Sequence, residues 1–122
     1  MKKPKIYIAG PMRGLPCYNV QPFNITAKHL RQRGWEVENP AEISAGYGTP
    51  EQIEADSALL AAVMSADLHA LETCDAILLL DGWTTSKGAR KELAAALAAN
   101  LRIFTHINDG IPCAEQLDPE WP

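Results

Sequence analysis

A run of five apolar residues, Ala76 to Leu80 (AILLL), constrains the fold more than any other feature of the chain. A short uninterrupted apolar run is typical of a strand that is buried on both faces, as in the interior of a parallel sheet. The polar stretch after it, Asp81 to Glu92 (DGWTTSKGARKE), opens a long alanine-rich helix. The sequence therefore places a loop and a helix start at the carboxyl end of a buried strand, where open parallel sheets bind their ligands.

The rest of the chain alternates between strand and helix patterns. Three further strands are predicted from β-branched, aromatic or alternating residues: Lys5 to Ala9, Trp35 to Glu38 and Arg102 to Ile107. The first of them is expected to lie centrally. The order βαβαβαβ predicts an α/β fold with a parallel sheet of about four strands and crossover helices, in a flavodoxin-like or Rossmann-like three-layer arrangement. We expect residues 1–122 to form one domain, with an irregular tail over residues 108–122.

Periodicity and end signals predict the crossover helices. The first has Pro22 in its first turn and Gly34 as its stop, and its apolar stripe is expected to comprise Phe23, Ile25, Ala27 and Leu30. Thr49 starts the second, because Gln52 lies three residues on in the pattern of a capping box. The segment from there to Asp81 is predicted to be one helix, or two with a bend near Ser65.

The last crossover helix is predicted to be capped by Ser86 and to run to about Asn100. Three of its residues are expected to face inward: Leu93, Ala96 and Leu97. The prediction thus puts a polar cap and an apolar stripe on one helix, directly after the buried strand.

Charge and composition limit the classes of partner. The net charge is −4, and the 11 Lys and Arg residues are spread along the chain, which argues against a nucleic-acid polymer or a membrane surface as partner. The three cysteines and three histidines show no ligand spacing, so no metal and no cofactor is predicted. Only a few apolar residues follow the first lysines, too few for a signal peptide, and no run is long enough for a membrane helix. We expect a cytoplasmic protein with reduced thiols.

The first three predicted strands are each followed by a loop with candidate ligand-binding residues, and parallel topology places these loops at the same edge of the sheet. After the first strand comes GPMRG, in which Gly10 and Gly14 would let the backbone approach a ligand and Arg13, beside Met12, could bind a phosphate or carboxylate in a paired fashion. The alternative is a tight turn with a solvated arginine. The motif is neither GxGxxG nor a Walker loop, so kinase and dinucleotide signatures are lacking.

Glu92 is the acid of most interest because of its neighbours on the predicted helix. The plain interpretation is a solvent-facing acid near the helix start, where the helix dipole favours negative charge. However, Gly88 lies four residues back on the same face and leaves open space beside the carboxylate. Ser86 and the first N–H groups of the helix lie one turn away, which suits an anion.

The two motifs, IYIAGPMRG at Ile6 to Gly14 and GWxxSxGAxxE at Gly82 to Glu92, resemble those of the nucleoside 2-deoxyribosyltransferase superfamily, within its small bacterial and phage branch. The likeness extends from Lys5 to about Ile107. It implies that Glu92 is the nucleophile that attacks the anomeric carbon of a nucleoside, as in retaining glycosidases. It further implies that Tyr7 orients that carboxylate.

The resemblance also implies roles for other positions. Asp67 matches an aspartate near the departing base, although a helix-surface acid is the alternative. Related transferases tend to have an acid near position 86, whereas the similar 2'-deoxynucleoside 5'-monophosphate N-hydrolases have a serine that holds the phosphate. Ser86 and the RG of the first loop, with Arg13, therefore point to a 5'-phosphate.

Two further candidates come from loop chemistry and topology. Trp83 would stack on the base, or form a hydrophobic lid without a ligand. Asn39, with Glu42 in the NPAE loop, would contact sugar hydroxyls.

The predicted function is cleavage of the N-glycosidic bond of a (deoxy)nucleoside 5'-monophosphate, with transfer of the sugar to water or to a base. The alternatives are a non-catalytic nucleotide-binding module, or a glycosidase of NAD or a modified phage nucleotide. Relatives form dimers that complete each other's sites, so the resemblance implies a homodimer or higher homo-oligomer. An apolar group on the second helical segment would form the subunit contact or part of the core: Leu59, Leu60, Val63 and Met64.

Overall fold

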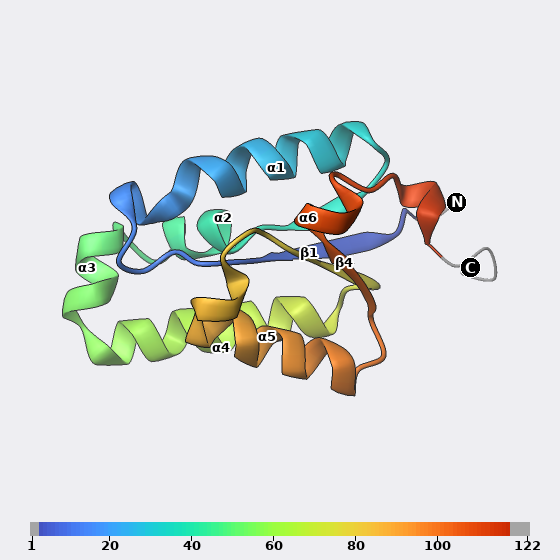
Figure 1. Ribbon diagram of the computed structural model, residues 1–122. Helices are drawn as coiled ribbons and strands as arrows, with labels where there is room; N and C mark the ends of the chain where they lie inside the picture. The colour runs from blue at the N-terminus through green and yellow to red at the C-terminus, as the bar shows by residue number, and fades with distance from the viewer. Residues whose placement is uncertain (1–2, 118–122) are drawn as a thin grey trace.

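The computed structural model, which describes residues 3–117, has a three-layer α/β fold (Figure 1). Its sheet has the strand order β2-β1-β3-β4, and every neighbouring pair is parallel. The strands are β1 (Lys5–Ala9), β2 (Glu36–Glu38), β3 (Ala76–Leu79) and β4 (Arg102–Thr105). The predicted fold class and the central position of β1 are confirmed. Because the chain reverses its direction of strand addition between β2 and β3, the switch point of the topology lies at the carboxyl ends of β1 and β3.

Helices cover both faces of the sheet (Figure 1). Within residues 3–117 they are α1 (Val20–Gln32), α2 (Pro40–Ala45), α3 (Pro50–Ala55), α4 (Ser57–Glu72), α5 (Lys87–Ala98) and α6 (His106–Asp109). Short 3-10 turns precede α1 and α5 and follow α6: η1 (Pro16–Asn19), η2 (Trp83–Thr85) and η3 (Ala114–Gln116). In Figure 1, α1, α2 and α6 lie on one side of the sheet, α4 and α5 lie on the other, and α3 lies at one end.

The central strand β1 divides the core into two layers, because successive side chains of a strand point to opposite faces. Ile6 and Ile8 pack in the layer of α1, whereas Tyr7 and Ala9 pack in the layer of α4 and α5. All four side chains are completely buried. The pleat of β1 thus points the Tyr7 ring at the two helices that carry the predicted catalytic acids.

The second helical segment is broken earlier than predicted. The capping box of Thr49 and Gln52 is present, as expected, and starts α3. The break lies at Asp56 rather than near Ser65, because the Asp56 carboxylate accepts the backbone N–H groups of Ala58 and Leu59 and so caps a new helix, α4. The chain consequently turns between α3 and α4, and α3 lies beside the loop that follows β1 (Figure 1).

Two inward positions were predicted wrongly. Ile25 of α1 is 47% exposed and Leu97 of α5 is 59% exposed. Thr26 is buried in place of Ile25, and Ala96 faces the core beside the exposed Leu97. In both helices the prediction placed one more residue on the apolar face than the side of the helix that packs on the sheet can bury.

The segment after β4 is less irregular than predicted. It forms α6 and η3, and it packs back on the sheet: the indole N–H of Trp35 donates to the carbonyl of Pro112 at 2.9 Å, and Leu117 is buried in the core. Residues 118–122 of the predicted tail lie outside the described residues. None of the helices between residues 3 and 117 combines the length and the apolar character needed to cross a bilayer.

Candidate active site

A cavity of about 710 Å³ opens at the carboxyl ends of β1 and β3, between the β1–α1 loop, α3, α4 and the start of α5. We call it the site cavity. Most residues predicted to bind or to react line it: Gly10, Met12, Arg13, Gly14, Asp67, Ser86, Gly88 and Glu92. The structure therefore brings together segments that are far apart in the sequence, as parallel topology predicts.

Glu92 lies in the wall of this cavity and is held from beneath by Tyr7. The Tyr7 hydroxyl donates a hydrogen bond to Oε2 of Glu92. Burial raises the pKa of Glu92 to about 8, the hydrogen bond from Tyr7 lowers it in part, and the nearby Asp67 raises it further. Glu92 is therefore a desolvated acid with a fixed orientation, and the interpretation as a solvent-facing helix residue is wrong.

Tyr7 is a proton donor to this acid over the ordinary pH range. Its pKa is raised well above the usual value, chiefly by burial and then by the charges of Glu92 and Asp67. A phenol that stays protonated can only donate to the carboxylate, so it favours the ionised form of Glu92.

Asp67, on α4, is the second acid of the site cavity. Burial raises its pKa to about 7, and its Oδ1 atom is buried without a hydrogen-bond partner among the described residues. Its charge contributes to the raised pKa values of both Glu92 and Tyr7, which places the three groups close together. The two desolvated carboxyl groups are therefore coupled, because ionisation of Asp67 makes ionisation of Glu92 less favourable.

Ser86 marks the start of α5 at another side of the cavity. Its Oγ accepts the backbone N–H of Ala89 at 3.1 Å, so the predicted cap is present. The hydroxyl proton is still free to be donated to a ligand, because an accepting hydroxyl keeps its own O–H. Two cations that sequence reasoning did not single out, Lys87 and Lys91, also line the cavity. Both lie within the motif Gly82 to Glu92, and their positive charge is the sequence feature from which they could have been predicted.

The three glycines of the site are needed for different structural reasons. A Cβ at Gly88 would meet nothing closer than the Ser86 Oγ at 4.0 Å, so the open space predicted beside Glu92 is present. A Cβ at Gly10 would lie 2.9 Å from the Cβ of Leu80. Gly10 thus allows the ends of β1 and β3 to approach each other. Gly14 has a φ of +81°, which its turn requires.

Arg13 lies at the mouth of the cavity. Its side chain is 62% exposed, and its Nε lies 3.8 Å from Oε1 of Glu54 on α3. Sequence reasoning missed Glu54, because no spacing links a loop after β1 to a helix some forty residues on. The predicted cation, Arg13, is therefore present at the mouth of the cavity, where it faces the carboxylate of Glu54 from the same chain.

The remaining wall of the site cavity is apolar, and sequence reasoning did not assign it to the site. Its members come from α1, α3 and α4: Val20, Phe23, Ile53, Leu60, Val63, Met64 and Leu68. Leu60, Val63 and Met64 belong to the group that was predicted to form either a subunit contact or the core. An apolar wall opposite a few polar groups is the usual composition of a small-molecule site.

Besides Tyr7, which supports Glu92 from the core, two predicted residues do not line the cavity. Trp83 is half-buried in η2 and packs against the core layer of α4 and α5. Asn39 is 1% exposed and caps α2: its Oδ1 accepts the N–H of Ala41, and its Nδ2 donates to the Oδ1 of Asn24. Both polar atoms of the Asn39 side chain therefore form hydrogen bonds within the fold.

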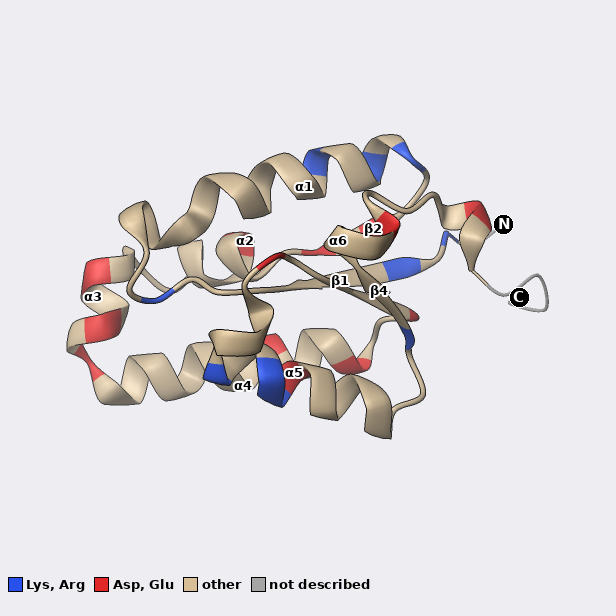
Figure 2. Cartoon of the chain, viewed as in Figure 1, with Lys and Arg blue, Asp and Glu red and all other residues tan. Residues whose placement is uncertain are grey.

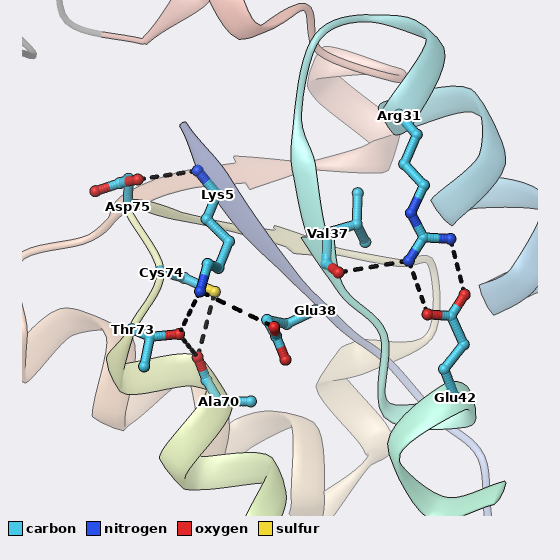
Figure 3. Close-up of polar contacts among 9 residues, drawn as sticks. All are labelled: Lys5, Arg31, Val37, Glu38, Glu42, Ala70, Thr73, Cys74 and Asp75. Carbon is cyan, nitrogen blue, oxygen red and sulfur yellow. Dashed lines mark hydrogen bonds and ion pairs between the residues drawn. The ribbon is translucent and has the colours of Figure 1, made fainter. Parts of the chain in front are cut away.

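Glu42, which was grouped with Asn39, is not among the residues that line the cavity. Figure 3 shows its bidentate pair with Arg31, with distances of 2.7 and 2.8 Å. The same view shows Lys5, whose Nζ donates to Thr73 Oγ1 at 3.1 Å and lies 4.0 Å from Glu38. These contacts join α1 to α2 and β1 to its neighbours, and none of their residues lines the site cavity. Within residues 3–117, no group of three or more His, Cys, Asp or Glu side chains is placed to hold a metal ion.

Comparison with known proteins adds one match. A family with the description "Domain of unknown function (DUF4406)" matches residues 4–105, which include all the strands and every residue of the site cavity named above. A search of curated proteins finds no match.

Proposed function

We propose a function for this chain, which belongs to the DUF4406 family, from the geometry of its site: it cleaves the N-glycosidic bond of a (deoxy)nucleoside 5'-monophosphate. The single observation that carries the proposal is the partly buried Tyr7–Glu92 hydrogen bond at the wall of a cavity that Asp67 also lines. A carboxylate that is desolvated, oriented and accessible to a ligand is suited to nucleophilic or electrostatic catalysis at an anomeric carbon.

The proposed reaction uses the two acids in different protonation states. Glu92, as the carboxylate, attacks the anomeric carbon while the bond to the base breaks, and the electron pair of that bond leaves with the base nitrogen. Asp67, as the acid, gives its proton to the departing base. Water then attacks the anomeric carbon, returns a proton to Asp67 and releases Glu92. A second base in place of water would give transfer. This order of reaction steps is that of a retaining glycosidase.

The raised pKa values keep a proton on the pair near neutral pH, but the higher pKa of Glu92 places that proton mainly on Glu92, so the reactive form, with Glu92 ionised and Asp67 protonated, is the minor of the two singly protonated forms. One proton shared by a pair with pKa values of about 7 and about 8 leaves one acid and one carboxylate near neutral pH. The Tyr7 hydroxyl favours the carboxylate on Glu92, because it donates to that group. Asp67 has no such donor among the described residues and is therefore the group we assign as the acid.

The 5'-phosphate is assigned to the start of α5 and to the mouth of the cavity. The unpaired N–H groups of α5, the Ser86 hydroxyl and the cations Lys87 and Lys91 form one anion-favouring wall. Arg13 adds a fork of donors from the opposite loop. The apolar wall on α3 and α4 is left for the base, whose faces are apolar.

A homo-oligomer is a separate proposal about the same region. Met64 and Leu68 line the cavity and are nevertheless 39% and 37% exposed, so the rim offers an apolar surface to a second copy. A molar-mass measurement in solution tests it: a monomer over the working concentration range would contradict it.

The function is tested with a panel of nucleosides and their 5'-monophosphates, with free base as the readout. We expect base to be released from at least one monophosphate and more slowly from the matching nucleoside. Addition of a second base separates transfer from hydrolysis, because transfer yields a new nucleotide. Tight binding of a monophosphate without release of base from any compound would show a binding module and would contradict the proposal.

A further inference from the structure

Glu54 is the one acid of the site cavity that the proposed reaction does not use. It lies on α3 and faces Arg13 across the mouth, with 3.8 Å between the Arg13 Nε and the Glu54 Oε1. Figure 2 shows acidic residues on α3 beside the basic position on the β1–α1 loop. The cation that the proposed function assigns to the phosphate is thus already paired with an internal anion.

The same carboxylate also influences a second residue of the β1–α1 loop. It raises the pKa of Tyr18 above its usual value, chiefly through its interaction with the phenol side chain. Tyr18 also lines the site cavity. Glu54 therefore pairs α3 with the loop at Arg13, and its charge also acts on Tyr18 of the same loop.

The loop that Glu54 holds has an unfavourable backbone. Cys17, Tyr18 and Asn19 have φ values of 51°, 53° and 58°, and all three carry side chains in the left-handed region. Such residues persist only where surrounding contacts maintain them. The contacts here are few: Asn19 Nδ2 donates to the carbonyl of Pro11 at 2.8 Å, and the Tyr18 N–H donates to the carbonyl of Leu15 at 2.9 Å.

Helix α3, on the other side of the mouth, is also weakly held. It has six residues, and among them only Ile53 is buried. It packs chiefly on α4 and makes no extensive contact with the sheet. Both sides of the mouth are therefore free to shift when the contacts of Glu54 are lost.

We propose that Glu54 is a latch: it holds the strained β1–α1 loop against α3 and competes with an anionic ligand for Arg13. This inference rests on the proposed role of Arg13 in binding the phosphate. A phosphate takes the guanidinium fork in paired hydrogen bonds, and its charge repels Glu54, so that the loop and α3 separate. A neutral nucleoside has no group to exchange for Glu54 and leaves the latch closed. Glu54 thereby determines how strongly the site prefers ligands with a phosphate.

The binding test compares Glu54→Gln with Glu51→Gln. Glu51 is a matched control, because it is an exposed acid on the same helix and its loss changes the net charge equally. Titrations use 2'-deoxynucleoside 5'-monophosphates and the matching nucleosides, in a Glu92→Gln background that blocks turnover. We expect Glu54→Gln to raise monophosphate affinity about two- to fivefold relative to Glu51→Gln, the range that exposed ion pairs reach in double-mutant cycles. Nucleoside affinity should stay the same, and the gain should vanish when Arg13→Gln is added.

Hydrogen exchange of the ligand-free chain tests the latch separately from any ligand. We expect Glu54→Gln, and not Glu51→Gln, to increase amide exchange at residues 14–19 while exchange in β1 and β3 is unchanged. Equal exchange in the two variants would overturn the latch. Lower or equal monophosphate affinity in Glu54→Gln, or no binding at all, would overturn the competition. Neither result depends on base release, so a failure of the proposed reaction is recognised independently.

Discussion

Tyr7 and Glu92 are joined by a hydrogen bond from the phenol to Oε2 of the carboxylate, which links the central strand β1 to helix α5. Tyr7 is completely buried and belongs to the core layer beneath α4 and α5. The acid at the cavity is therefore oriented by a residue whose own position is set by the core. Such support is what keeps a reactive group in a fixed geometry.

Replacement of Tyr7 by Phe keeps the ring in the core and removes only the donor. A hydrogen bond to a charged group contributes about 1.5–3 kcal/mol, so we expect kcat/KM for base release to fall about 10- to 100-fold. The hydrogen bond lowers the pKa of Glu92, so its loss should also move the acidic limb of the pH profile to higher pH. Tyr47→Phe is the control, because Tyr47 is 43% exposed and lies outside the cavity lining. Equal rates in the two variants would exclude a role for the hydroxyl.

The dependence of kcat/KM on pH follows from the two acids. The reactive form needs Glu92 ionised and Asp67 protonated, hence one proton on the pair. With pKa values of about 7 and about 8, this form is most populated between those two pH values. The rate should fall below that window as the pair gains a second proton, and above it as the pair loses its last proton. Asp67→Asn should lower the rate and abolish the alkaline limb. A flat profile across the window would contradict the assignment.

Ser86→Asp separates the cap of α5 from the proposed phosphate contact. Aspartate caps helices as well as serine does, so we expect the free energy of unfolding to change by less than about 0.5 kcal/mol, whereas Ser86→Ala should cost about 1 kcal/mol. The added charge faces the assigned phosphate, so the preference for monophosphates over nucleosides should fall at least about tenfold, which corresponds to about 1.4 kcal/mol. Urea unfolding and base-release rates measure the two effects. An unchanged preference would move the phosphate away from α5.

The fold could be predicted from the sequence because its signals are local. The apolar run Ala76 to Leu80, the short strand at Lys5 and the cap at Ser86 each follow from nearby residues, and the parallel sheet follows from the alternation of strands and helices. The site edge followed in turn, since loops after parallel strands converge. The break at Asp56 was missed because no Gly or Pro marks it, and the cap preference of Asp56 and Ser57 was the only local signal that a new helix starts there.

Features of the site that depend on distant contacts were not predictable. Glu54 meets Arg13 only because α3 turns back toward the first loop. Val63 resembles a core residue in the sequence, and only the packing of α4 shows that it lines a cavity. Asn39 was placed at the correct edge of the sheet, but its side chain serves as a cap. Topology thus places a residue near a site, and local hydrogen bonding decides whether its side chain is available.

The central claim is that Glu92 carries the reaction, and base release by Glu92→Gln tests it most directly. Glu72→Gln, which alters an exposed glutamate at the end of α4, is the matched control. Loss of a nucleophile typically costs about 10⁴- to 10⁶-fold in kcat. We predict that Glu92→Gln releases base from its best monophosphate at least about 10³-fold more slowly than the unmodified chain, while Glu72→Gln releases it at the original rate. Undiminished release by folded Glu92→Gln would contradict the proposed function.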